Sequence, residues 1–268
     1  MNLIVALSAE AKPIVEHLGL QKHSLDSPYT LFHNERYQLV VSGIGKQNMA
    51  HAVSFLHGRK TYKNAPWLNI GLAGHGNARL GKAFQIAQFS DQENEQKGYP
   101  PQVYSTPIAK TFLKTCNQPS VEYKKDTAYD MEGSAFFKTA YRYSVTELVQ
   151  SIKIISDNPE QPVSRFDKSL VQSLISQNMK TISNFALEMM QIASEISPSP
   201  ANEKIWEEIK KTFPISETQT HQIKKAIRQS SALGIPASQL LQLVHSTEDT
   251  KSLISNLNQK LEEKNLFS

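Results

Sequence analysis

Short apolar runs recur along the first part of the chain, and each run ends in small or polar residues. The runs are NLIVAL from position 2, YQLVVSGIG from 37, WLNIGLAGHG from 67, KAFQIAQFS from 82 and SIKIISDN from 151. Continuous apolar runs of this length predict strands that are buried on both faces, as in a parallel sheet.

Helical periodicity appears between and after these strands. Met49, Val53 and Leu56 predict a helix after the second strand, and a further helix is predicted over residues 131–142. A long helix is predicted over 166–195, with an apolar stripe formed by Leu170, Leu174, Ile182, Phe185, Met189 and Ile196. Strands that alternate with helices predict an α/β domain with a largely parallel sheet.

The segment SPSPAN, residues 197–202, interrupts this pattern. Two prolines among small polar residues predict a linker between a domain at 1–196 and a segment at 203–268. The second segment has only helical patterns, which predict a C-terminal helical appendage used for packing or dimerisation. A helix-turn-helix-like module that binds a partner is the alternative, and its near balance of charges argues against DNA.

Composition excludes several classes of protein. The 29 basic and 25 acidic residues are mixed along the chain and predict no nucleic-acid partner. The single cysteine, Cys116, cannot form an internal disulfide, which suits a reducing cytoplasm. The N-terminus lacks the charged start of a signal peptide, and no apolar run is long enough for a membrane span. No motif predicts a metal site.

Polar and glycine-rich residues cluster where the predicted strands end. They are Ser42–Gly45, Gly71–Gly76 and Ser156–Asn158. In open α/β sheets, ligands bind beyond the carboxyl ends of the strands. The sequence therefore predicts a site at one edge of the sheet.

Four acidic residues could carry chemistry, and each also has a structural interpretation. Glu10 follows the first strand and could be a first-turn glutamate favoured by the helix dipole. In DMEG, Asp130 could be a helix cap and Glu132 a first-turn residue. Asp157, directly after a strand, could be an N-cap. The glycines of SGIGK, residues 42–46, could bring backbone N–H groups close to a ligand.

Taken together and in this order, the five motifs resemble one family. Glu10, SGIGK, NIGLAGHG, AYDMEGSA and ISDN are similar to the pattern of the nucleoside phosphorylase and nucleosidase superfamily. The nearest resemblance is to the methylthioadenosine/S-adenosylhomocysteine nucleosidases, over roughly residues 1 to 195. It implies a three-layer α/β/α domain around a mixed sheet.

The resemblance also implies roles for individual residues. Glu10 would deprotonate the attacking water, Glu132 would bind the ribose hydroxyls and Asp157 would protonate the purine at N7. Met131 would pack on the ribose, and Asp130 is left as the helix cap. The other positions implied to line the substrate site are Ile44, Gly45, Ala73, Gly74 and Ser156.

The implied reaction is hydrolysis of the N-glycosidic bond of a purine nucleoside, of a 5′-thio- or 5′-deoxyadenosine type. It needs no cofactor or metal, and the resemblance implies a cytoplasmic homodimer in methionine salvage. Phosphorolysis is an alternative, but SGIGKQN is not a phosphorylase turn, and Lys46 and Arg79 are the local basic candidates. A nucleoside-binding protein without turnover is a second alternative.

The chain departs from the family pattern at three places. Leu72 stands where the family has a serine, and Gly81–Lys82 replaces a Gly-Asp pair. Between Phe89 and Ala128 the chain is short and shows no match to the strand that packs on the purine. The candidates for a different base pocket are Tyr99, Pro100, Pro101 and Tyr104.

Overall fold

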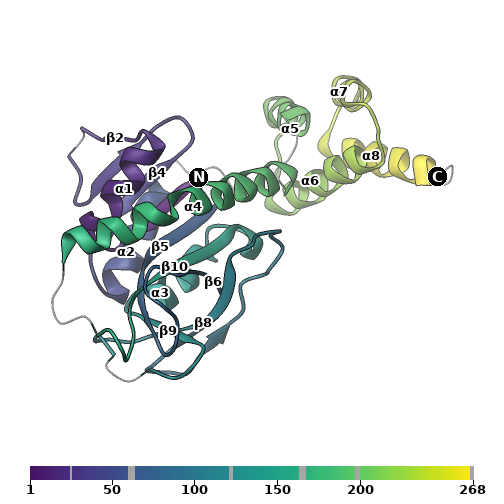
Figure 1. Ribbon diagram of the computed structural model, residues 1–268. Helices are drawn as coiled ribbons and strands as arrows, with labels where there is room; N and C mark the ends of the chain where they lie inside the picture. The colour runs from purple at the N-terminus through teal and green to yellow at the C-terminus, as the bar shows by residue number, and fades with distance from the viewer. Residues whose placement is uncertain (25, 60–63, 121–122, 163–166, 197–199, 266–268) are drawn as a thin grey trace. The chain divides into compact units, whose positions relative to one another are not determined.

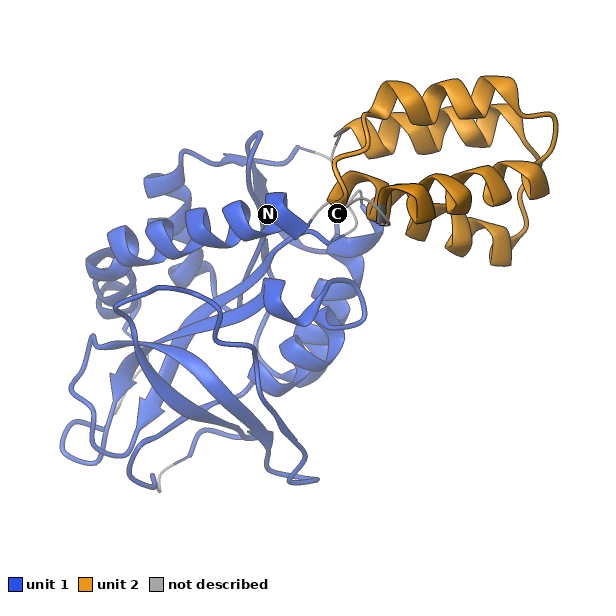
Figure 2. Ribbon diagram, turned by 90° about the vertical axis from the view of Figure 1, so that its right-hand side faces the viewer, with its two compact units in different colours: residues 1–196 blue, residues 197–268 orange. Residues whose placement is uncertain are grey.

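The structure is a computed structural model that describes residues 1–24, 26–59, 64–120, 123–162, 167–196 and 200–265. It divides into two compact units, Met1–Ile196 and Ser197–Ser268, which Figure 2 shows in blue and orange.

The described residues of unit 1 form a mixed sheet of ten strands, and Figure 1 shows helices packed around this sheet. The strands are β1 (Asn2–Val5), β2 (Gln21–Lys22), β3 (Thr30–His33), β4 (Gln38–Val41), β5 (Trp67–His75), β6 (Ala83–Asp91), β7 (Lys97–Gly98), β8 (Ala109–Thr115), β9 (Thr127–Asp130) and β10 (Val149–Asp157).

Strand β1 lies between β4 and β5 and is parallel to both. Strand β5 is also parallel to β10 and antiparallel to β9. Because β10 pairs with β6, β6 with β8 and β8 with β9, these pairings close a ring that returns to β5. The carboxyl ends of β1, β4, β5 and β10 therefore meet at one edge.

Helices cover both faces of the sheet. Helices α1 (Ser8–Leu18) and α4 (Lys168–Ile196) pack together on one face, and α2 (Lys46–Gly58) and α3 (Gly133–Ala140) pack on the other. Alternate residues of β1 point to opposite faces, so Leu3 and Val5 join the core beneath α1 and α4, while Ile4 joins the core beneath α2 and α3. A short 3₁₀ turn, η1 (Thr146–Leu148), precedes β10. The predicted α/β fold is confirmed.

Two predicted helices differ in their ends. Helix α3 begins at Gly133 and ends at Ala140, and α4 begins at Lys168. Most of the predicted α4 stripe is buried, but Leu170 and Ile196 are each 39% exposed. They lie in the first and last turns of the helix, where fewer neighbouring side chains can cover them. Phe166, at the predicted start, lies outside the described residues.

The described residues of unit 2 form four helices, α5 (Pro200–Thr212), α6 (Glu217–Ala232), α7 (Ala237–Ser246) and α8 (Thr250–Asn265). Their buried side chains form a core of their own, which includes Ile209, Ile223, Leu240, Leu253 and Leu257. Helix α5 begins at Pro200, within the predicted linker. Residues 197–199 of that linker lie outside the described residues.

Among the described residues, no helix combines the length and the apolar character needed to cross a membrane.

Candidate active site

A cavity of about 180 Å³ lies at the sheet edge where β1, β4, β5, β9 and β10 end. Most of the residues expected to form a site line it together, although they come from distant parts of the chain. They are Glu10, Ile44, Ala73, Gly74, Met131, Glu132, Ser156 and Asp157. Gly45 does not line this cavity, and its backbone contacts Glu132 instead.

Glu10 is buried in the first turn of α1 and its carboxylate is held by three backbone donors. The N–H groups of Ala6 and Leu7 donate to Oε2 at 3.0 and 2.9 Å, and that of Leu72 donates to Oε1 at 2.9 Å. Burial raises the pKa of Glu10, although these hydrogen bonds oppose the shift. The residue is thus a first-turn glutamate whose carboxyl group faces the cavity.

Glu132 is buried at the start of α3, and Gly45 fixes its position. The Gly45 N–H donates to Glu132 Oε1 at 2.7 Å. Gly45 has a φ of 98°, a left-handed backbone conformation that glycine adopts without strain, and this directs its N–H toward the carboxylate. Burial, and next the charge of Asp130, raise the pKa of Glu132 to about 7.

The buried partner of this acidic group is Lys153, which the sequence analysis missed. Its Nζ lies 2.8 Å from Asp130 Oδ2, and both side chains are buried. Burial lowers the pKa of Lys153, but the charges of Asp130, Glu132 and Glu10 outweigh it and raise the pKa above its usual value. A lone lysine within the apolar strand SIKIISD was the available signal.

The structure changes the interpretation of Asp130. Its Oδ2 accepts from the Gly133 N–H at 2.8 Å, so it does bind the start of α3. Its carboxylate also pairs with Lys153 and accepts from the Thr115 hydroxyl at 2.8 Å. Asp130 is therefore the counter-ion of a buried lysine as well as a cap.

Asp157, at the end of β10, has a hydroxyl partner on each carboxylate oxygen. Ser156 Oγ donates to Oδ1 at 2.5 Å, and the Tyr123 hydroxyl donates to Oδ2. Tyr123 and Pro119 also line the cavity. Neither residue was singled out from the sequence, because no local pattern marks the segment that precedes β9.

The residues considered for a different base pocket lie elsewhere. Tyr99 is 66% exposed, and Tyr104 is buried against Phe185 of α4 and donates to the carbonyl oxygen of Glu147. Neither they nor Pro100 and Pro101 are among the residues that line the cavity. Tyr104 is part of the hydrophobic core, because its ring packs beneath α4.

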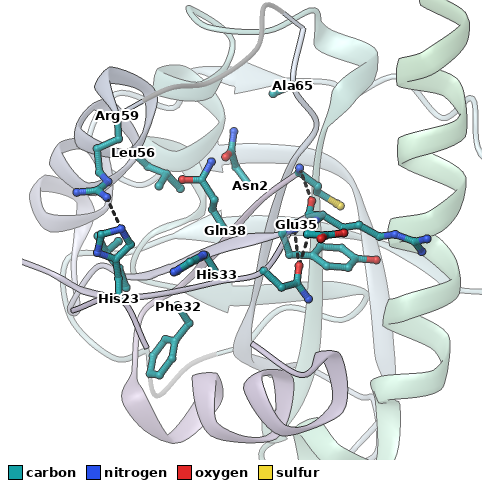
Figure 3. Close-up of a pocket in the computed structure, with 14 residues that line it drawn as sticks. Asn2, His23, Phe32, His33, Glu35, Gln38, Leu56, Arg59 and Ala65 are labelled. Atoms are coloured by element: carbon teal, nitrogen blue, oxygen red, sulfur yellow. Dashed lines mark hydrogen bonds between the residues drawn. The ribbon is translucent and has the colours of Figure 1, made fainter. Parts of the chain in front are cut away.

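A second cavity, of about 310 Å³, lies near the start of β1 and contains His23, His33, Gln38 and Arg59 (Figure 3). Of the described residues that line it, Glu35 alone is acidic. It therefore lacks the several convergent carboxyl groups of the first cavity. Within the described parts of the chain, no cluster of His, Cys, Asp and Glu could hold a metal ion.

Comparison with solved structures agrees with this architecture. A nucleosidase for 5′-methylthioadenosine and S-adenosylhomocysteine from Campylobacter jejuni matches with a TM-score of 0.55 and 17% identity, over 70% of this chain and 97% of its own. The 5′-methylthioadenosine nucleosidase of Arabidopsis thaliana matches with a TM-score of 0.55 and 16% identity, over 73% of this chain and 96% of its own.

The fold is that of the methylthioadenosine/S-adenosylhomocysteine nucleosidases. A further nucleosidase of this type, from Colwellia psychrerythraea 34H and solved with adenine, matches with a TM-score of 0.55 and 16% identity, over 71% of this chain and 93% of its own. No protein-family model matches the sequence, and neither does any curated protein. At these identities the similarity establishes the fold alone.

Proposed function

We propose that this protein hydrolyses the N-glycosidic bond of a purine nucleoside. The observation that carries the proposal is the convergence of Glu10, Glu132 and Asp157 on one cavity of a nucleosidase fold. These are the three acidic positions that the sequence resemblance implies for the base, the ribose clamp and the acid. They come from α1, the start of α3 and β10.

Cleavage of this bond builds positive charge on the ribose, as in glycoside hydrolysis. Glu132 would accept hydrogen bonds from the ribose hydroxyls, and its negative charge would stabilise the developing cation. Met131 would pack against the sugar. The raised pKa of Glu10 makes its carboxylate a stronger proton acceptor, which suits a general base for water.

The purine leaves poorly as an anion, so a proton must reach its N7. Asp157 lies on the cavity wall and Ser156 Oγ orients its carboxyl group through Oδ1. A protonated Asp157 would donate through Oδ2 to the leaving base. The adenine in the Colwellia structure makes an adenine nucleoside the first choice of substrate.

Electrostatics favour water over phosphate as the nucleophile. Lys46, one candidate for an anion pocket, already lies 3.1 Å from Asp91 Oδ1 and 2.7 Å from Glu93 Oε2. Arg79 is exposed and is absent from the cavity lining. Several carboxylates near the bond would repel a phosphate dianion, since like charges disfavour each other at close range.

Beyond Ile44 and Met131, which both cavities share, lies a further cavity of about 400 Å³. Its lining is mainly polar and includes Lys46, Asn48, Glu93 and Asn117. A nucleoside with a long polar 5′ substituent would be accommodated there as well as a methylthio group. The substrate panel must therefore include both kinds.

The test is base release, followed by chromatography, with and without phosphate. The panel is methylthioadenosine, S-adenosylhomocysteine, 5′-deoxyadenosine, adenosine, inosine and uridine. We expect release of adenine without phosphate. Asp157→Asn should reduce turnover by about 10²- to 10⁴-fold, the usual contribution of a general acid, with an unchanged circular dichroism spectrum.

Glu35→Gln, in the cavity of Figure 3, is the matched control and should retain wild-type turnover. Release that requires phosphate would establish a phosphorylase instead. Nucleoside binding without any release, unaltered by Glu10→Gln, would establish a binding protein. Wild-type turnover in Asp157→Asn would refute the assignment of the acid.

A further inference from the structure

Tyr123 forms a hydrogen bond to Oδ2 of Asp157, the oxygen through which Asp157 would donate a proton to a leaving base. Its hydroxyl donates to Asp157 Oδ2, while Ser156 Oγ donates to Oδ1. Burial, and next the hydrogen bond to Asp157, raise the pKa of Tyr123, so the phenol keeps its proton. Each oxygen of Asp157 therefore already has a hydroxyl partner, and the Tyr123 phenol competes with a purine for Oδ2.

The position of Tyr123 is built into the fold. A Cβ atom at Gly74 would lie 2.7 Å from both Asp157 Oδ2 and the Tyr123 hydroxyl oxygen, so only glycine leaves room for this contact. The next residue of the segment is anchored, because the Lys124 N–H donates to the Tyr129 hydroxyl at 3.0 Å. The Tyr123 and Tyr129 rings lie 5.2 Å apart between centroids.

The free space beside Tyr123 is small for a ligand site. The cavity measures about 180 Å³, whereas sites for small molecules usually measure roughly 300–1,000 Å³. Tyr123 and Asp157 both line this space. Rotation of the Tyr123 side chain about its own bonds would enlarge the cavity and free Oδ2 without moving the anchored backbone at Lys124.

We propose that Tyr123 closes the base subsite in the free protein, and that a bound purine displaces its phenol from Asp157. This rests on the proposed function, since it assigns the base to the Asp157 end of the cavity. We call the conformer with the phenol on Asp157 closed and the conformer without this contact open. A base binds only the open conformer, so its measured Kd is the intrinsic Kd divided by the fraction of molecules that are open.

Tyr123→Phe removes the hydroxyl and keeps the ring. Without the hydrogen bond that holds the closed conformer, the open fraction rises, and the KM for the nucleoside and the Kd for free adenine should both fall by about tenfold. The kcat should stay the same, because the phenol has left Asp157 before the proton is transferred.

The experiment compares wild type, Tyr123→Phe and Tyr104→Phe by steady-state kinetics and by calorimetric titration with adenine. Tyr104→Phe is the matched control, since it also loses a tyrosine hydroxyl, from a residue in the core away from the cavity. It should leave kcat, KM and Kd unchanged. Urea unfolding verifies that each variant is folded.

A lower KM and Kd in Tyr123→Phe alone, with unchanged kcat, supports the proposal. Equal KM and Kd values in wild type and Tyr123→Phe overturn it, because the hydrogen bond between Tyr123 and Asp157 would then not oppose binding. A lower kcat with unchanged KM also overturns it, since the phenol would then take part in proton transfer. If no nucleoside is cleaved, the proposed function fails, but adenine titration still decides the role of Tyr123.

Discussion

At the scale of single residues, the site is a set of buried charges that do not balance. Glu10, Asp130 and Glu132 are buried around one buried ammonium group, that of Lys153. Desolvation penalises every ionised group, so burial raises the pKa of carboxyl groups in this cluster. It raises the pKa of Glu10, and that of Glu132 to about 7.

The raised pKa predicts a pH-dependent stability. Between the ordinary pKa of 4.5 and about 7, the folded protein holds a proton on Glu132 that the unfolded chain has released, so stability falls as pH rises through this window. Glu132→Gln removes this dependence. The variant should match wild type near pH 4 and exceed it by about 3 kcal/mol at pH 8.

Urea unfolding at both pH values measures the difference. Glu16→Gln, on the exposed side of α1, is the control and should show no comparable change between the two pH values. A Glu132→Gln variant that is less stable than wild type at pH 8 would contradict the assigned shift. The same shift predicts that ribose binding strengthens from pH 6 to pH 8, as the clamp gains its charge.

At the scale of elements, the end of β5 shapes the site by leaving space for another segment. A Cβ atom at Gly76 would lie 2.1 Å from the carbonyl oxygen of Lys124, which is far inside van der Waals contact. The clash is with backbone, so the segment that carries Tyr123 would have to move. Gly76, after the third predicted strand, thus allows the segment that contains Lys124 to pack closely against the end of β5.

Gly76→Ala should therefore destabilise unit 1 by about 1–3 kcal/mol, the usual cost of overpacking. Gly58→Ala is the control, because a Cβ there meets no atom within 4 Å at the end of α2. It should be neutral or stabilising by up to about 1 kcal/mol. Urea unfolding of both variants decides the matter, and equal stabilities would contradict the packing role of Gly76.

At the scale of the whole molecule, each unit has its own apolar core. The two clusters of unit 1 contain residues from Leu3 to Met189, and the cluster of unit 2 contains residues from Ile205 to Leu261. A separate core is the main requirement for independent folding. The capping box of Ser216 and Gln219 further stabilises the start of α6 within unit 2.

A fragment of residues 1–196 should thus fold alone, with a cooperative thermal transition and α/β circular dichroism. A fragment of residues 200–268 should be helical by the same measurement. An unfolded 1–196 fragment would show that unit 1 depends on unit 2. If the fragment folds and retains base release, unit 2 has no part in the chemistry.

Local patterns were sufficient for five of the ten described strands and for the edge of the sheet that carries the site, whereas β2, β3, β7, β8 and β9 were not predicted. Apolar runs marked β1, β4, β5, β6 and β10, and the polar residues next to the ends of β1 and β10 marked Glu10 and Asp157. Glu132 was marked instead by DMEG, at the start of a predicted helix. This worked because strand burial and the carboxyl-end rule depend on residues close together in the sequence. The roles of these residues came from the resemblance, and they stay predictions.

Tertiary structure alone decided which distant groups meet. The pairing of β5 with both β9 and β10 brings Lys153 to Asp130, and the gap left by Gly74 admits Tyr123 to Asp157. No local pattern encodes these contacts, because they depend on strand order and on space between segments. Local sequence thus determined where the carboxylates lie along the chain. Packing determined their partners, which are Lys153 for Asp130, the Gly45 N–H for Glu132 and the Tyr123 hydroxyl for Asp157.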